Sequence, residues 1–280
     1  MRVRATVFFQ NLPVALATAT LWVLCAFGVG RRVRRHATID VFWGIGFLVL
    51  YLECLVASRY LDATAPSPWS LAHGQGGRVA VLVALAAWSL RLSGHLAWRQ
   101  RGTPEDSRYV MIMRGAKGRN ETLYALRTIY LVQALLLWFV SIPLQWVAFR
   151  VHFGDLLVVA LAVVLLGVGV EATGDEQLRR FVRDPATAGT TLDRGLWRYT
   201  RHPNYFGDAL VWAGFYLCAA SSGWGWLTMA SPVTMWWLLT SLSGKPLLEA
   251  KLTRTRAGYA EYVARTSSFV PWPPRRGSPD

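Results

Sequence analysis

The most distinctive polar segment lies between residues 195 and 208 and reads Gly-Leu-Trp-Arg-Tyr-Thr-Arg-His-Pro-Asn-Tyr-Phe-Gly-Asp. Pro203 suits the first turn of a helix, because the N–H that proline lacks has no partner there. The free amides that follow it, beside two arginines, predict a site for an anion such as a pyrophosphate. Asn204 and Asp208 share one face of this helix, and Gly207 lets another group approach the backbone closely. The same residues also suit a simple interfacial anchor, with arginine for lipid headgroups and tyrosine for the aromatic belt.

A second polar segment follows a long apolar run and carries Glu171, Asp175 and Arg179 at intervals of four residues. Such a row drifts by only about 40° per step, so the three side chains share one helix face. Acid–arginine pairs at this spacing also stabilise an ordinary helix end slightly. Because Glu171 directly follows uncharged residues, we favour the wall of a polar pocket over that simpler interpretation.

Two further groups of polar residues lie inside apolar stretches. Trp88, Arg91, His95 and Trp98 fall within about a 100° arc of a helix, which predicts a polar stripe that faces the helix bundle rather than lipid. Asp40 lies near one end of another apolar stretch, among basic residues. An ionisable group at bilayer depth is costly unless it is paired or solvated, so each one is a candidate for function. A structural histidine, or a carboxylate that reaches the interface, is the alternative.

The composition identifies the elements that must hold these residues. Of the 280 residues, 53 % are hydrophobic and 16 % are charged, and the mean hydropathy is +0.29, which excludes a disordered chain and a single soluble domain. The net charge of +14 would suit a nucleic-acid-binding protein, but 14 tryptophans within long uncharged runs would not. The chain is therefore expected to be an all-α, polytopic membrane protein.

Seven stretches are long and apolar enough to span a bilayer. They cover residues 11–29, 39–57, 79–98, 128–149, 156–173, 205–220 and 226–243, and the fourth contains Pro143, which should kink it rather than end it. With the N-terminus outside and the C-terminus cytoplasmic, 24 of the 30 lysines and arginines lie in cytoplasmic segments, in agreement with the positive-inside rule. We therefore expect one transmembrane domain of seven helices over residues 1–280, in a bacterial inner (plasma) membrane, with a short tail at 274–280.

No motif of a familiar soluble enzyme accompanies these spans. The sequence lacks GxGxxG, a P-loop, GxSxG and any cysteine–histidine cluster with metal spacing. No metal site is therefore expected, and the membrane helices themselves would have to hold a nucleotide cofactor.

With these residues in view, the chain resembles the DUF1295 group of the steroid 5-alpha-reductase-like integral membrane proteins. The resemblance covers nearly the whole chain and includes the segment 195–208, part of which is also similar to the sterol C14-reductase branch. The other motifs that carry it are Asp40-Val-Phe-Trp-Gly, Trp88-Ser-Leu-Arg-Leu, Glu105-Asp-Ser-Arg-Tyr, Tyr259-Ala-Glu-Tyr and Phe269-Val-Pro-Trp.

The resemblance implies a bundle of seven or more helices that binds NADPH from the cytoplasmic side and delivers hydride to an activated double bond of a lipid-like substrate. It implies that Glu171 and Asp175 form one wall of the cofactor site and that Asn204 and Asp208 form the nicotinamide side. Tyr199 matches a tyrosine of the same block. Glu171 departs from the steroid reductases, which have asparagine at the matching position.

The chemistry of such a reduction assigns roles to the candidate residues. Hydride addition to an enone builds negative charge on the carbonyl oxygen, which a proton donor or a cation stabilises. The candidates for this donor are Arg91, His95, Tyr109 and Asp40. The candidates for NADPH binding, mostly in a core at 150–273, are Arg101, Arg108, Glu171, Asp175, Arg179, Tyr199, Arg201, His202, Asn204, Tyr205 and Asp208. The expected partners are membrane lipids and an apolar substrate from the bilayer, without nucleic acid.

Two other functions stay open. The Arg-His-Pro-x-Tyr-x-Gly run also resembles isoprenylcysteine carboxyl methyltransferases, which use S-adenosylmethionine. Those proteins usually carry a Glu-Glu pair after the last span, where this chain has only Glu249. A non-catalytic lipid-binding membrane protein could keep the polar stripe as a helix contact. The single Glu249 and the Glu105-Asp-Ser-Arg-Tyr motif favour the reductase.

Overall fold

The computed structural model describes residues 2–61, 67, 69, 76–150, 152–242, 249 and 252–275. Within these residues every named element is a helix, and an isolated bridge joins Thr200 to Ser267. The all-α class expected from the sequence is thus confirmed. The chain divides into two compact units, Met1–Leu161 with Phe215–Ser231, and Ala162–Gly214 with Pro232–Asp280.

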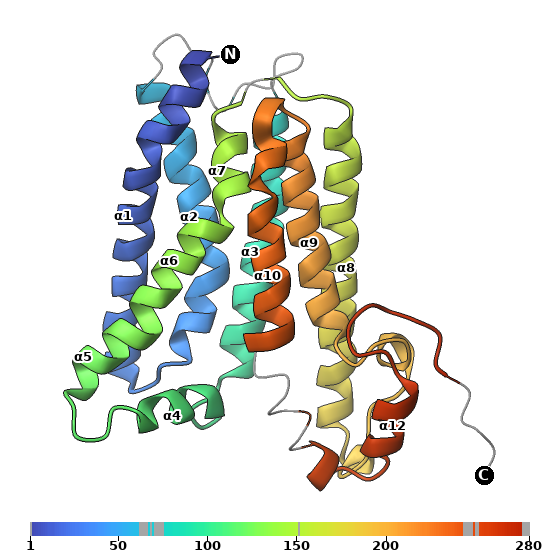
Figure 1. Cartoon of the computed structure of the whole chain (residues 1–280). Coiled ribbons are helices and arrows are strands. Elements are labelled where there is room, and N and C mark those ends of the chain that lie inside the picture. The colour runs from blue at the N-terminus through green and yellow to red at the C-terminus, as the bar shows by residue number, and fades with distance from the viewer. Residues whose placement is uncertain are drawn as a thin grey trace. The chain divides into compact units, whose positions relative to one another are not determined.

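The first unit is built on three long helices, α1 (Arg2–Val33), α2 (Thr38–Tyr60) and α3 (Gly77–Arg99), and α2 packs against both of the others (Figure 1). A Cβ atom on Gly44 would lie only 2.8 Å from Oγ of Ser93, so this glycine allows α2 and α3 to approach closely. The unit also contains α4 (Ser107–Arg114), α5 (Glu121–Ala125), η1 (Leu126–Tyr130), α6 (Leu131–Val140), α7 (Ile142–Ala148) and η4 (Gly223–Met229).

The second unit contains most of α8 (Leu156–Arg183) and of α9 (Pro203–Ala220). It also contains η2 (Pro185–Thr187), η3 (Gly195–Arg198), most of α10 (Ala230–Trp237), η5 (Leu238–Leu242) and α12 (Tyr259–Arg265). The expected helix start at Pro203 is confirmed. Residues 271–275 are not helical, in agreement with their proline content, and residues 276–280 of the expected tail lie outside the described residues.

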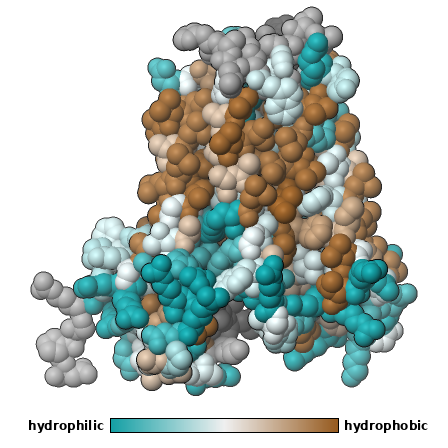
Figure 2. Space-filling model, turned by 180° about the vertical axis from the view of Figure 1, so that it is seen from behind, coloured by the Kyte–Doolittle hydropathy of each residue, from teal (hydrophilic) through white to brown (hydrophobic). Residues whose placement is uncertain are grey.

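Five helices in the described part of the chain are long and apolar enough to cross a membrane: Thr6–Val33, Thr38–Tyr60, Gly77–Arg99, Glu121–Val140 and Leu156–Arg183. They correspond to the first five expected spans. The sixth expected span lies in α9, and the seventh falls on η4, α10 and η5, with residue 243 outside the described residues. Large apolar side chains are exposed along these helices, including Val158 at 73 % and Leu21 at 64 %. Figure 2 shows hydrophobic residues over the helices and hydrophilic residues gathered toward their ends, which suits an integral membrane protein.

The fourth span differs from the expectation at both of its ends. Its helix begins at Glu121, seven residues before the expected start, and the α-helix is interrupted at Ser141. Pro143 lies in the first turn of α7, where its missing N–H is tolerated, and Figure 1 shows α7 running at an angle to α6. The proline therefore bends the path, as expected, but it does so by starting a new helix.

Candidate functional site

Glycine residues bring α8 and α9 into close contact in the second unit. A Cβ atom on Gly207 would lie 2.4 Å from the backbone N of Glu171, and one on Gly167 would lie 2.7 Å from the carbonyl oxygen of Gly207. Distances this short leave room only for hydrogen at both positions, because the atoms they meet belong to the backbone. The predicted close approach at Gly207 is therefore present, and the group that approaches is the α8 backbone.

This contact brings the predicted acidic and amide residues together. Nδ2 of Asn204 on α9 donates a hydrogen bond to Oδ1 of Asp175 on α8, over 3.0 Å. Glu171, Asp175 and Asp208 are only 3 %, 7 % and 8 % exposed. We call Glu171, Asp175, Asn204 and Asp208 the acidic wall. A carboxylate inside an apolar helix pair is costly, so such a cluster indicates a site rather than simple packing.

The segment before α9 is fixed by the C-terminal part of the chain. The backbone N–H of Arg201 donates to the carbonyl oxygen of Ser267 over 2.9 Å, and Oγ1 of Thr200 donates to the carbonyl oxygen of Phe269 over 2.7 Å. The N–H of Trp272 donates in turn to the carbonyl oxygen of Tyr199. Ser267 and the motif Phe269-Val-Pro-Trp thus hold the Arg-His-Pro segment in place.

Arg201 and His202 share a carboxylate that we did not place among the site residues from the sequence. Oε1 of Glu249 lies 2.9 Å from Nε2 of His202 and 3.4 Å from Nε of Arg201. The ring of Tyr205 stacks on His202 with its centroid 5.4 Å away. Glu249 is 47 residues from His202 in the sequence. Its place after the last span was the one feature of the sequence that drew attention to it.

The other predicted cofactor residues are more scattered. Tyr199 is 43 % exposed, and Arg179 on α8 forms an ion pair with Glu176, one turn earlier on its own helix. Arg101 and Arg108 belong to the first unit. Within the second unit the structure therefore brings the acidic wall together, while Arg179 pairs with Glu176.

Three predicted residues of the first unit form one network. Nη2 of Arg108 donates to Oδ2 of Asp40 over 2.7 Å, and the hydroxyl of Tyr109 donates to Oδ1 of Asp40 over 2.5 Å. Asp106 accepts from the backbone N–H of Arg108 and thereby caps α4, and it also pairs with the Arg108 guanidinium. Glu105 accepts the backbone N–H groups of residues 36 and 37 at the start of α2. The matched loop motif therefore fastens α4 to the first turn of α2.

Electrostatic interactions fix the protonation states of Tyr109 and Arg108, which lie outside the membrane-spanning helices. Burial raises the pKa of Tyr109 well above its usual value, and the charge of Asp40 raises it further. Burial alone would lower the pKa of Arg108, but Asp40 and Asp106 outweigh it and raise that pKa. At neutral pH Tyr109 is therefore a neutral hydroxyl and Arg108 a cation.

Replacing Tyr109 by phenylalanine should lower the free energy of unfolding by about 1–3 kcal/mol, because Asp40 loses a donor in a poorly solvated place. The neutral hydroxyl stabilises the folded state fully below pH ~10, the unfolded value, and this contribution is lost as the pH rises toward the raised pKa. Unfolding in detergent between pH 7 and 11, followed by tryptophan fluorescence, should show a smaller alkaline loss in the variant. Tyr124→Phe is the control, since the Tyr124 hydroxyl bonds no described residue; equal curves for both variants would contradict the prediction.

The polar stripe on α3 is only partly buried. Trp88 is fully buried, Arg91 and His95 are half-buried, and Trp98 is 37 % exposed, with its ring centroid 6.2 Å from that of His95. The expected packing of this stripe is therefore present at Trp88, whereas Arg91, His95 and Trp98 keep part of their surface exposed.

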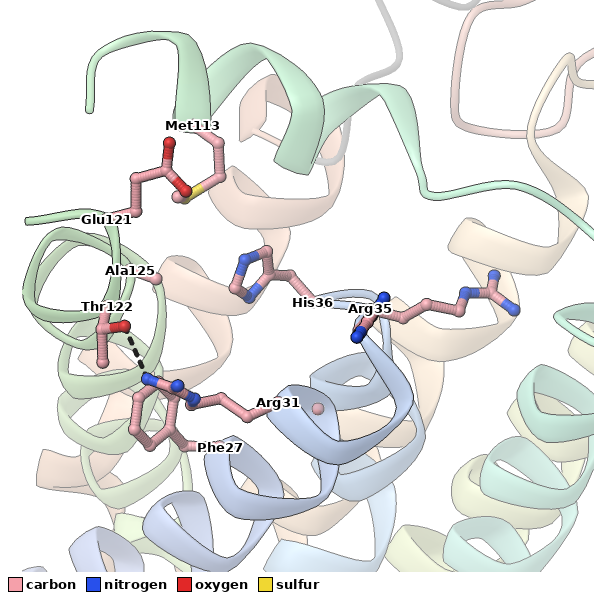
Figure 3. A pocket seen from close by; sticks show the side chains of 10 residues that line it. Phe27, Arg31, Arg35, His36, Met113, Glu121, Thr122 and Ala125 are labelled. Atoms are coloured by element: carbon pink, nitrogen blue, oxygen red, sulfur yellow. Dashed lines mark hydrogen bonds between the residues drawn. The ribbon is translucent and has the colours of Figure 1, made fainter. Parts of the chain in front are cut away.

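A cavity of about 250 Å³ lies elsewhere in the first unit. It is lined by residues of α1, the turn after it, α4 and α5, and none of them is among the predicted site residues (Figure 3). The acidic wall itself has hydrogen-bonding groups that suit a dinucleotide: carboxylates that can accept from ribose hydroxyls, and an amide with a carboxylate for a carboxamide. A nicotinamide dinucleotide thus fits the chemistry of these residues.

Comparison with known proteins gives a family match that covers most of the chain. No curated protein and no solved structure matches it. Residues 26–266 of the 280 match the family described as a protein of unknown function, DUF1295. The matched range includes the Asp40 network, the acidic wall and the Arg-His-Pro segment before α9, and it ends just before Ser267. The chain therefore belongs to the DUF1295 family, which is steroid 5-alpha-reductase-like.

Proposed function

We propose that this protein is a membrane-embedded, NADPH-dependent reductase that transfers hydride to an activated C=C bond of an enone or enal in a lipid-like or steroid-like substrate. The observation that carries the proposal is the acidic wall, in which Asn204 donates to Asp175 beside the buried Glu171 and Asp208. A dinucleotide offers hydroxyl and amide groups that carboxylates and an amide side chain of this kind can bind.

Each member of the acidic wall has a proposed task. Asp208 and Asn204 hydrogen-bond the carboxamide of the nicotinamide, and Glu171 or Asp175 binds a ribose hydroxyl. Bound NADPH supplies the hydride, while the protein orients it and keeps water away. The phosphates need cations that can bind them in a bidentate manner. The candidates for this task and for the rest of the site are Arg101, Arg179, Arg198, Arg201, His202, Tyr199 and Tyr205.

Among the four candidate proton donors we favour Tyr109. Its raised pKa keeps the hydroxyl protonated, and the hydrogen bond to Asp40 over 2.5 Å holds it in place. To protonate a substrate, the O–H would turn from Asp40 to the new acceptor. The guanidinium of Arg108 lies over the Tyr109 ring at 5.4 Å and would stabilise the negative charge that proton transfer leaves behind. We therefore propose that Arg108 positions and supports Tyr109 rather than binding a phosphate. Arg91 and His95 remain the alternative donors.

We propose further that all seven apolar stretches cross a bacterial plasma membrane, with the N-terminus outside and the C-terminus in the cytoplasm. The distribution of lysine and arginine supports this orientation, because 24 of the 30 lie in the segments then assigned to the cytoplasm. This orientation exposes the start of α9 to the compartment that contains NADPH. The apolar substrate would enter from the bilayer.

A second candidate function is methyl transfer from S-adenosylmethionine. The observation in its favour is the carboxylate of Glu249 beside Arg201 and His202, which could bind the amino group of that methyl donor. The acidic wall does not require a methyl donor, and a lone glutamate is a weaker match than the pair that these methyltransferases usually carry.

The test of the proposal is equilibrium binding of NADPH and of S-adenosylmethionine to the full chain purified in a mild detergent. We expect saturable NADPH binding and no S-adenosylmethionine binding, together with NADPH oxidation when a lipid-like enone is added. Binding of the methyl donor alone would replace the reductase by the methyltransferase. A protein that binds neither would be left with the lipid-binding role.

A further inference from the structure

The cavity of the first unit is lined mainly by positive charge and does not depend on the proposed function. Arg31, Arg34, Arg35 and His36 lie on its walls with Thr122 and Phe27. In the described part of the chain no ion pair joins any of the three arginines to a carboxylate. Glu121 also lines the cavity, but Figure 3 shows its carboxylate beside Met113, on the side opposite to Arg31. The cavity therefore has a surplus of cations.

Two of these cations, Arg31 and Arg35, are held in place by neighbouring groups. Nη1 of Arg31 donates to Oγ1 of Thr122 over 2.5 Å, and the guanidinium lies 5.9 Å from the centre of the Phe27 ring. Thr122 still has its own O–H to donate. The guanidinium of Arg35 instead donates to the carbonyl oxygens of residues 100 and 104.

His36 provides a further donor. Its Nδ1 lies 3.3 Å from the hydroxyl of Tyr130, and Figure 3 shows the ring in the middle of the group. When Tyr130 donates to Nδ1, Nε2 carries the proton and can donate to an anion. Arg31, Thr122 and His36 thus offer donors of the kind that bind a phosphate group.

Arg34 occupies a position that a glycine would normally take. It directly follows α1 and has φ of 55°, and among the described residues it is the one non-glycine residue with positive φ. A left-handed residue after a helix is usually glycine, because a side chain is strained there. Arginine at this position puts a cation at the cavity despite that strain.

The residues around the cavity suit the binding of a lipid better than that of a free ion. Val29, Val33 and Leu123 are 41 %, 50 % and 42 % exposed, and they flank Arg31 and Thr122 along the chain. The short helix α4 on the same cavity exposes Val110 and Met111 as well, which is typical of a helix that lies in the membrane interface. About 250 Å³ is less than the usual range for drug-sized ligands and suits a headgroup rather than a dinucleotide.

We propose that this cavity binds the phosphate of an anionic phospholipid headgroup, through Arg31, Arg34, His36 and Thr122, while the acyl chains lie against the exposed apolar side chains of α1 and α5. The site is a fixed lipid contact at the end of α1. Basic pockets of this kind between membrane helices recognise anionic headgroups.

The test compares three ligands on the full chain in an uncharged detergent: short-chain phosphatidylglycerol, short-chain phosphatidylcholine and inorganic phosphate. Binding is followed by tryptophan fluorescence and by the shift in melting temperature. We expect phosphatidylglycerol to bind at least about tenfold more tightly than either of the others, since only it combines net negative charge with acyl chains. Equal binding of both lipids would overturn the proposal, and so would inorganic phosphate that binds as tightly as phosphatidylglycerol.

Arg34→Gly is the decisive variant, because glycine suits the left-handed backbone and the fold should survive. It should weaken phosphatidylglycerol binding about tenfold, the loss expected for one charge-assisted contact. The matched control is Arg32→Gln, which removes the same charge from an exposed neighbour that does not line the cavity. Equal weakening in both variants would show general attraction to the basic segment and would overturn the site.

Discussion

NADPH binding should weaken by about tenfold to a hundredfold in Asp175→Asn, measured by equilibrium titration of the detergent-purified protein. Asparagine keeps the size of the side chain and an oxygen that can accept the hydrogen bond from Asn204. It loses the charge that makes a bond from a ribose hydroxyl strong. The variant should therefore fold like the original protein, because its contact with α9 is retained.

Glu176→Gln is the matched control for this prediction. Glu176 is the next residue on α8 and pairs with Arg179 and Arg180, so its substitution removes one negative charge from the same helix turn without touching the acidic wall. An exposed pair of this kind contributes little to stability. NADPH binding that stays unchanged in Asp175→Asn, or that falls equally in Glu176→Gln, would exclude Asp175 as the residue that binds the ribose.

Local patterns in the sequence were sufficient to predict the features that depend on a single helix. The start of α9 at Pro203 follows from the stereochemistry of proline, and the shared face of Asn204 and Asp208 follows from helical periodicity. The first five spans follow from hydropathy in the same manner. These features need no knowledge of which helices are neighbours.

Contacts between distant segments could not be read in this way. Asp40 and Arg108 were assigned to different tasks from the sequence, although they are ion-paired across 68 residues. The pairing depends on the loop before α4 returning to the first turn of α2, and no periodicity encodes that path. Glu249 reaches His202 across 47 residues for the same kind of reason.

The cavity at the end of α1 was missed for a different reason. In the sequence its three arginines, Arg31, Arg34 and Arg35, indicate only the cytoplasmic side, because a run of arginines beside a span is ordinarily explained by topology. The signal that distinguishes Arg34 is its backbone conformation, which sequence alone does not show. The count of charged residues thus predicts the orientation of the chain in the membrane, while the backbone conformation at Arg34 points to a binding site.

The contact between α8 and α9 gives the largest expected effect on stability. Gly207→Ala should lower the free energy of unfolding by about 3 kcal/mol, at the upper end of what overpacking costs, because the new Cβ would meet backbone atoms of Glu171 and Gly167 that no rotamer change can move. Helix pairs in membranes depend on small residues at such points. Gly169→Ala on α8 is the control: a Cβ there meets nothing within 4 Å, so this variant should be as stable as the original or slightly more so. Thermal unfolding in detergent compares the two. If Gly207→Ala melted together with Gly169→Ala, the close contact of the two helices would be wrong, and the acidic wall that it assembles would lose its foundation.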